Sequence, residues 1–183
     1  MKIAVASDHA GFGLKAAVAR HLALAGHQVT DFGTDSPDVS VDYPSFGLAV
    51  GRAVAEGRVE RGVCVCGTGI GISMAANKVP GVRAAVVHDV TTASLARRHN
   101  DANVICLGGR TLGSAEALDA VDVFFTSTFE GGHHQPRLDE LSAIDGLRAA
   151  VDPGPAAGTA AGPGPDRHPR RVGPAQRKAG AGP

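Results

Sequence analysis

Long apolar runs are missing from this chain of 183 residues. The opening apolar segment IAVA ends at Ser7, and no later stretch reaches the ~18 residues that a membrane-spanning helix needs. A basic segment followed by an apolar core, which marks a secretory signal, is also missing from the start. We therefore expect a cytoplasmic protein that does not contact a membrane.

Cysteine is scarce, with three residues in all. Cys64 and Cys66 stand two positions apart in what reads as one strand, where side chains point the same way but too far apart for disulfide geometry. We expect free thiols. A Cys-x-Cys pair can be half of a zinc site, but no second pair of Cys or His at ligand spacing accompanies it, so we predict no metal there.

Net charge is absent as well, since 18 Lys and Arg balance 18 Asp and Glu. Residues 1–150 carry 13 basic and 16 acidic side chains (−3), and residues 151–183 carry 5 and 2 (+3). The second segment holds 7 Pro and 7 Gly and has little to bury, so we expect a disordered tail after one folded domain, 1–150. Its short basic run RHPRR is typical of a solvated tail, and we predict no nucleic-acid partner.

Apolar runs typical of strands alternate with helical spacing over residues 1–150. Such alternation, with runs rich in Val, Ile and Ala, favours a parallel sheet covered on both faces. We predict a doubly wound, Rossmann-like α/β fold: a three-layer αβα sandwich around a five-stranded parallel sheet. The expected strands are 2–7, 27–33, 62–66, 82–87 and 103–109, and the expected helices are 12–26, 44–57, 71–78, 89–100, 114–129 and 137–151.

The segment VCVCGTGIGISMAANK, residues 63–78, leads from a strand through a cysteine and alternating glycines into a helix. Gly67, Gly69 and Gly71 permit positive φ and leave backbone N–H groups uncovered. A dinucleotide fingerprint would need glycine where Ile72 stands, and a P-loop would need a lysine that this loop lacks. The loop suits a phosphate or a developing oxyanion, although a tight turn around a buried cysteine would look the same.

Six motifs in fixed order resemble the type B ribose-5-phosphate isomerases and the related galactose-6-phosphate isomerase subunits. They are SDHAG after the first strand, DYP, CGTGIGISMAANK, RHNDANV, GGR and FEGG-x-H-x-x-R, and they cover residues 1 to about 148. The resemblance implies an isomerase that interconverts ribose 5-phosphate and ribulose 5-phosphate through an enediolate. That reaction moves a proton between C1 and C2 and needs a base, but no metal or redox cofactor.

The resemblance also implies roles for individual residues. Cys66 matches the family's base, because the position at which some members carry a carboxylate is Ile72 here. Thr68 would hydrogen-bond the base or a substrate hydroxyl, and His99 would open the furanose ring. The implied substrate-binding residues are Asp8, His9, Tyr43, Gly67, Gly69, Gly71, Asn100, Arg110, His133 and Arg137. Plainer alternatives exist for some: Asp8 as a helix cap, Tyr43 as a core aromatic and His99 as a residue favoured at a helix C-terminus.

His99 and Asn100 end a predicted helix and precede the fifth strand. This order places them at the amino edge of the sheet, away from Cys66. We therefore expect them to serve a neighbour's site in a two-fold homodimer, with a tetramer as the alternative assembly.

The chain departs from the family after FEGG, where His133 replaces the usual arginine. One phosphate contact is therefore in question, while Arg110 and Arg137 remain. The departure leaves open the same chemistry on another sugar, either a hexose phosphate or an unphosphorylated aldose. A non-catalytic phosphosugar-binding module is a third alternative, disfavoured because a binder needs no base.

Overall fold

The computed structural model describes residues 1–151 and 170–173. Five parallel strands form the centre of the sheet, in the order β4-β5-β3-β1-β2. They are β1 (Lys2–Ser7), β2 (Gln28–Asp31), β3 (Arg61–Cys66), β4 (Ala84–Val86) and β5 (Val104–Gly108). The predicted five-stranded parallel sheet is confirmed, and the observed ends of strands and helices differ from the predicted ones by at most three residues.

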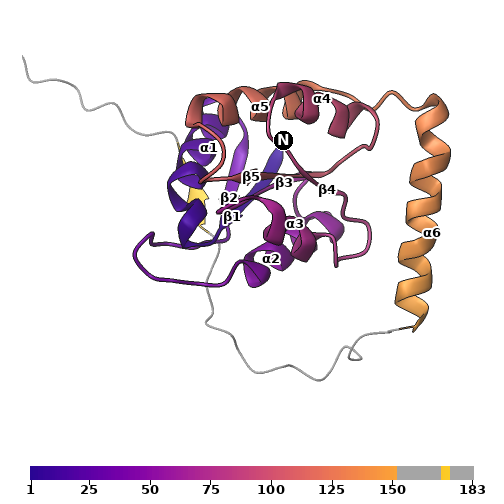
Figure 1. Ribbon diagram of the computed structural model, residues 1–183, viewed down its shortest axis with the longest axis horizontal. Helices are drawn as coiled ribbons and strands as arrows, with labels where there is room; N and C mark the ends of the chain where they lie inside the picture. The colour runs from indigo at the N-terminus through magenta and orange to yellow at the C-terminus, as the bar shows by residue number, and fades with distance from the viewer. Residues whose placement is uncertain (152–169, 174–183) are drawn as a thin grey trace, which may run out of the picture.

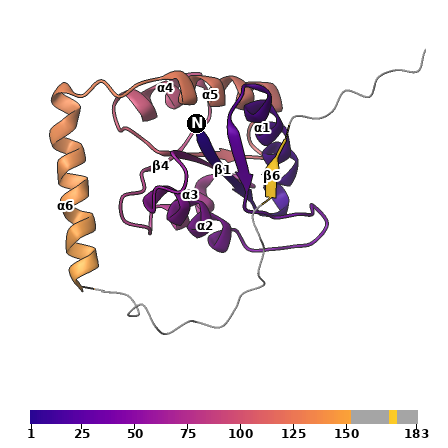
Figure 2. The same ribbon diagram turned by 180° about the vertical axis from the view of Figure 1, so that it is seen from behind.

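Helices cover both faces of the sheet, which confirms the three-layer arrangement (Figures 1 and 2). One face carries α1 (Phe12–Leu24), α4 (Val90–Arg98) and α5 (Ser114–Thr126), and the other carries α2 (Tyr43–Ala55) and α3 (Ile70–Ala76). Each face has its own apolar core, because successive strand residues point to opposite sides. In β3, for example, the valines pack under α1, α4 and α5, whereas Cys64 and Cys66 face α2 and α3.

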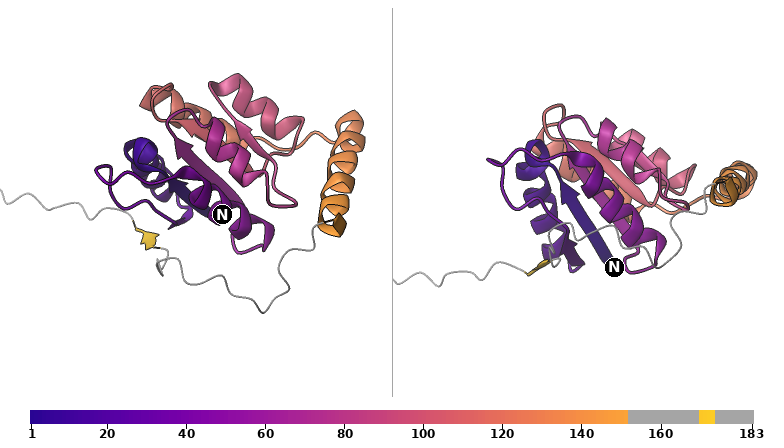
Figure 3. Two further views of the ribbon diagram at one scale, coloured as in Figure 1. Left: turned by 60° about the horizontal axis from the view of Figure 1, so that its bottom comes forward. Right: turned by 90° about the horizontal axis from the view of Figure 1, so that it is seen from below.

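The last helix, α6 (Gln135–Val151), stands apart from these layers in every view (Figures 1 to 3). It follows the short 3₁₀ turn η2 (Gly132–His134). Leu138 near its start is buried, but Leu141, Ile144 and Leu147 are 48, 51 and 67% exposed. The helix therefore presents an uncovered apolar stripe. Neither α6 nor any other helix in the described ranges combines the length and apolar character needed to cross a bilayer.

A sixth strand, β6 (Arg170–Val172), pairs antiparallel with β2 at the edge of the sheet. For these three residues the structure differs from the expected disordered tail. The edge of β2 offers unpaired N–H and C=O groups, which any extended segment can use. The prediction for the remaining tail concerns residues 152–169 and 174–183, which lie outside the described residues.

Candidate active site

The carboxyl ends of β1, β3 and β5 lie side by side, because the registers pair Ser7 with Val65 and Cys66 with Gly108. A Cβ atom on Gly11 would lie 2.6 Å from the Val65 carbonyl oxygen, so only glycine lets the segment after β1 approach β3 this closely. We call this edge the carboxyl-edge site. The predicted site residues found there are Asp8, His9, Tyr43, Cys66, Gly67, Thr68, Gly69, Gly71 and Arg110.

Cys66 ends β3 and is 4% exposed. Its Sγ accepts a hydrogen bond from the Gly69 amide at 3.2 Å, and its carbonyl oxygen accepts one from the Gly109 amide at 2.8 Å. All three cysteines are free thiols, as predicted. Burial, together with a hydrogen bond to Cys64, raises the pKa of Cys106, so that thiol stays protonated at neutral pH. Of the three, Cys66 is the cysteine placed at a strand end beside the glycine loop.

The glycine loop turns at Gly69, which has φ 78° and begins α3. A side chain there would be strained, and its Cβ would also lie 3.0 Å from the Leu107 backbone carbon. The Ile70 amide donates to Thr68 Oγ1 at 3.3 Å, and the Thr68 side chain is exposed. Ile72 is fully buried in the core, so it cannot contribute to the site.

Two further residues border this loop. The Tyr43 ring packs against Gly71, where a Cβ would lie 2.6 Å from the ring carbon Cζ, and Tyr43 is 39% exposed rather than a core aromatic. The Arg110 side chain lies over Gly67, where a Cβ would be 3.5 Å from its Cδ. The Arg110 amide donates to the Gly67 carbonyl at 2.9 Å, which fixes the base of this side chain beside the loop.

Asp8 and His9 follow β1 directly and both have structural contacts. Asp8 is 7% exposed, and its Oδ1 accepts a hydrogen bond from the Gly11 amide at 2.9 Å, so it does cap the turn η1 (His9–Gly11). His9 Nδ1 lies 3.2 Å from both the amide nitrogen and the carbonyl oxygen of Val41. This contact leaves Nε2 of His9 as the ring nitrogen available to a ligand.

Four predicted site residues lie at the opposite edge: His99, Asn100, His133 and Arg137. His99 caps the C-terminus of α4, and the chain then enters β5 at its amino end. The length of β5, roughly 13 Å from Val104 to Gly108, separates the two edges. One chain therefore holds two incomplete groups of predicted residues and does not bring them together.

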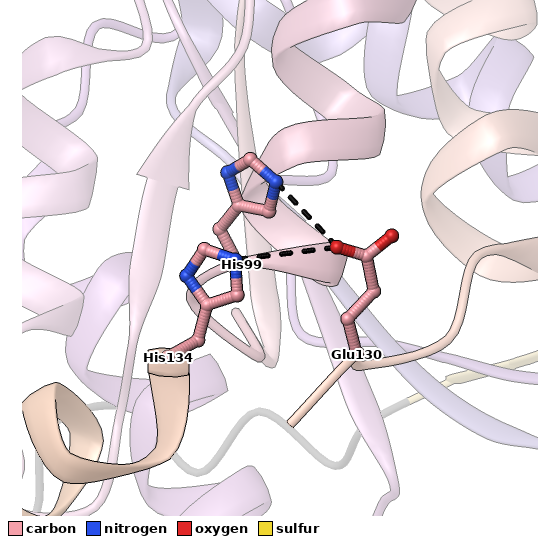
Figure 4. Close-up of side chains that lie close together, drawn as sticks. All are labelled: His99, Glu130 and His134. Carbon is pink, nitrogen blue, oxygen red and sulfur yellow. Dashed lines mark ion pairs between the residues drawn. The ribbon is translucent and has the colours of Figure 1, made fainter. Parts of the chain in front are cut away.

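Two residues at the amino edge were missed from the sequence, Glu130 and His134 (Figure 4). The His134 ring stacks on His99 with centroids 4.1 Å apart, and the His133 ring lies 3.9 Å from that of His134. A hydrogen bond from Arg98 lowers the pKa of Glu130, while burial and then His133 lower the pKa of His134. The Glu-x-x-x-His spacing within FEGG-x-H was the available signal, but nothing in the sequence connected it to His99.

Comparisons with known proteins cover most of the chain. Residues 3–141 match the family described as Ribose/Galactose Isomerase. The chain is 44% identical over 147 residues to ribose-5-phosphate isomerase B of Escherichia coli strain K12, covering 80% of this chain and 98% of the relative.

Solved structures show the same similarity. Ribose-5-phosphate isomerase B of Clostridium thermocellum aligns with a TM-score of 0.79 and 48% identity, over 81% of this chain and 99% of the other. The Mycoplasma genitalium ribose-5-phosphate isomerase B, solved with bound ribulose-5-phosphate, aligns with a TM-score of 0.77 and 42% identity, over 79% and 96%.

Proposed function

The chain belongs to the ribose/galactose isomerase family, and from this premise we propose that it interconverts ribose 5-phosphate and ribulose 5-phosphate. The observation that carries the proposal is the position of Cys66, whose sulfur meets the Gly69 amide at a strand end beside the glycine loop. An aldose–ketose isomerase needs a base to remove the proton at C2, whereas a phosphosugar-binding module needs none. The non-catalytic alternative is therefore set aside.

The reaction moves one proton from C2 to C1 and one from O2 to O1, and it requires no redox partner. The Cys66 thiolate removes the C2 proton of the open-chain aldose; the electron pair forms a C1–C2 double bond and leaves the C1 oxygen negative. The amides of Gly67 and Gly71 hold this oxygen, and the exposed Thr68 hydroxyl binds a neighbouring substrate oxygen. Transfer of the O2 proton to O1 and return of the proton from the Cys66 thiol to C1 then produce the ketose and restore the thiolate. The chain's own residues thus supply the base and the oxyanion donors.

We propose that Arg110 and His9 bind the phosphate group at the other end of the substrate. Arg110 lies over the glycine loop and can bind two phosphate oxygens at once. His9 offers Nε2 at the same edge, and Asp8 keeps His9 in place by capping the turn that follows β1. Tyr43 forms the side of the pocket next to Gly71.

The remaining groups come from a second subunit in this proposal. The amino edge carries His99, Asn100, His133 and Arg137, which lie too far from Cys66 within one chain to share a substrate. A groove of about 390 Å³ runs from Asn100 along α6, where it is lined by the exposed Leu141 and Ile144. Exposed apolar stripes of this kind mark interaction surfaces. A two-fold homodimer would cover the stripe and complete two sites, and two such dimers could form a tetramer.

The same chemistry on another sugar is the second candidate, and His133 is the observation that favours it. Where the family carries a permanently charged arginine, this chain has the exposed imidazole of His133, whose ring lies tilted against that of His134. A site with one guanidinium fewer binds phosphate less strongly and tolerates an uncharged substituent better. A six-carbon sugar phosphate or an unphosphorylated aldose would then be the preferred substrate.

A coupled isomerase assay over a panel of aldoses tests both candidates. The panel contains ribose 5-phosphate, a hexose 6-phosphate and free ribose, each with the full chain. We expect kcat/KM to be highest for ribose 5-phosphate. A higher value for either of the others selects the second candidate, and no turnover of any aldose contradicts the isomerase assignment. We further propose a cytoplasmic location, where these phosphorylated sugars are found.

A further inference from the structure

The chain between β2 and α2 runs through an irregular loop, residues 32–42 (Figure 1). Val41 near its end contacts His9, and Tyr43 directly after it borders the glycine loop of the carboxyl-edge site. Most residues from 35 to 42 are exposed, so the 32–42 loop buries little surface that could fix its path. Its path therefore depends on anchors at both ends, and α2 provides the anchor at the second end.

Lys15 provides the anchor at the first end. It lies in α1 but is only 2% exposed, and its Nζ donates to the Thr34 carbonyl oxygen at 2.7 Å. The same Nζ donates to the two carboxylate oxygens of Asp31, the last residue of β2, at 2.9 and 2.7 Å. An ammonium group has three N–H donors, and these three acceptors use all of them.

Backbone hydrogen bonds extend this anchor to the end of β1. The Oδ1 atom of Asp31 also accepts a hydrogen bond from the Gly33 amide at 2.9 Å. The Ser7 amide donates to the Gly33 carbonyl oxygen at 2.7 Å, and the Thr34 amide donates to the Ser7 carbonyl oxygen at 2.8 Å. The first residues of the 32–42 loop are thus tied to the strand that leads into the carboxyl-edge site.

The other end of the loop determines which way the His9 ring faces. The amide nitrogen and the carbonyl oxygen of Val41 both lie 3.2 Å from Nδ1 of His9. A displaced loop would turn this ring and move its free Nε2. Cys66 lies at the end of β3 and makes no use of the loop to hold its place in the sheet.

Stability alone is a weak reason for this ion pair, because apolar side chains of similar size often stabilise a fold as well as a buried ion pair does. The ammonium group also binds a loop carbonyl, which an apolar side chain could not do. We propose that Lys15 is a positioning residue: by binding Asp31 and Thr34 it fixes the 32–42 loop, and through Val41 it orients the His9 imidazole. Its effect on the reaction rests on the proposed function, in which His9 binds the phosphate group.

The first measurement follows the loop without using activity. Amide hydrogen exchange is measured by nuclear magnetic resonance in the full chain, in Lys15→Met and in the double variant Lys15→Met/Asp31→Asn. The double variant leaves no unpaired carboxylate and keeps an oxygen acceptor for the Gly33 amide, so it carries the test if Lys15→Met does not fold. We expect the Val41 amide to exchange about tenfold faster or more in both variants.

Two controls separate the loop from general loosening of the fold. The Gly11 amide, which donates to Asp8 Oδ1 just before α1, should keep its wild-type exchange rate. The matched control variant is Arg61→Met, because Arg61 Nη1 donates to two backbone carbonyls, at 3.0 and 3.2 Å, at the amino end of β3. That variant should leave Val41 exchange and the KM for ribose 5-phosphate unchanged.

The second measurement is a double-mutant cycle with His9→Ala in the coupled isomerase assay. A hydrogen bond to a charged phosphate accounts for about tenfold in affinity, so Lys15→Met should raise KM for ribose 5-phosphate by about tenfold and change kcat much less. In the His9→Ala background the same substitution should change KM by less than about twofold, because the group that it positions is gone. A merely structural role would give equal changes in both backgrounds.

Three results would overturn the proposal. They are equal Val41 exchange rates in the wild type and both variants, an equal increase at Gly11, which would mean that the disturbance passes along α1, and a tenfold rise in KM that persists in His9→Ala. If the wild type turns over no aldose, the proposed function fails, but the exchange rates still decide whether Lys15 holds the loop.

Discussion

Two inactive variants of this chain should restore activity to each other if each site is built from two subunits. Cys66→Ala removes the base from the carboxyl-edge site, and His99→Asn removes an imidazole from the amino edge. Each homodimer then carries one lesion in both of its sites. In a mixed dimer, both lesions fall in one site and the other site is intact.

The expected recovery follows from counting sites. Random exchange at equal concentrations makes half of all dimers mixed, and each has one intact site of two, so activity should approach roughly a quarter of the wild-type value. The measurement is the coupled isomerase assay on dimers assembled by co-expression. The matched control pairs Cys66→Ala with Thr68→Ala, whose lesions lie at the same edge, so that every site of the mixed dimer is damaged.

Recovery in the first pair but not in the second is the predicted result. If dimers carrying both variants are isolated with two affinity tags and remain inactive, the sites are not shared in the proposed way. If the wild-type chain is an active monomer by light scattering, the proposed assembly is wrong altogether. Either result would mean that Cys66 does not share an active site with the partner's His99.

Three other predictions concern packing, the phosphate site and the tail. Gly47→Ala should lower the free energy of unfolding in urea by ~1–3 kcal/mol, because the new Cβ would lie 2.6 Å from the Ile72 carbonyl oxygen. The control Gly13→Ala, which has open space around it, should not change this free energy. Equal stability of the two variants would contradict the close packing of α2 on α3. His133→Arg should lower KM for ribose 5-phosphate about tenfold at pH 8, because a guanidinium is permanently charged and can bind two phosphate oxygens at once. An unchanged KM at pH 8, with activity on a free aldose reduced, would instead support a site for a different sugar. A chain ending at Ala150 should keep its kcat and its melting temperature, because the tail has little apolar surface to bury. A drop of several degrees in the melting temperature would show that β6 stabilises the sheet.

The central layers could be predicted from sequence because each segment carries its own pattern. In β3 all the residues from Gly62 to Cys66 are buried, and an apolar run of this kind identifies a strand covered on both faces. Asp89 begins α4 as expected, accepting a hydrogen bond from the Thr92 amide at 2.6 Å. Local rules of this kind do not depend on distant parts of the chain.

Features that depend on distant contacts could not be predicted. The pattern of α6 gives an apolar stripe but not what covers it. Among the larger apolar residues between positions 135 and 147, for which burial is described, Leu138 alone is buried. Glu130 meets His99 only because its amide binds the carbonyl of Arg98 at the end of α4. The strand β6 pairs with β2 by backbone groups, for which its sequence RRV gives little signal.

The most direct test of the central claim measures the proton that Cys66 is proposed to remove. Ribose 5-phosphate labelled with deuterium at C2 is incubated with wild type and with Cys66→Ala, and cleavage of the C2–deuterium bond is followed by nuclear magnetic resonance. Loss of a general base should slow this cleavage by ~10²–10⁴ while substrate binding, measured by titration calorimetry, is largely kept. A variant that still cleaves the bond at a tenth of the wild-type rate would show that Cys66 is not the base.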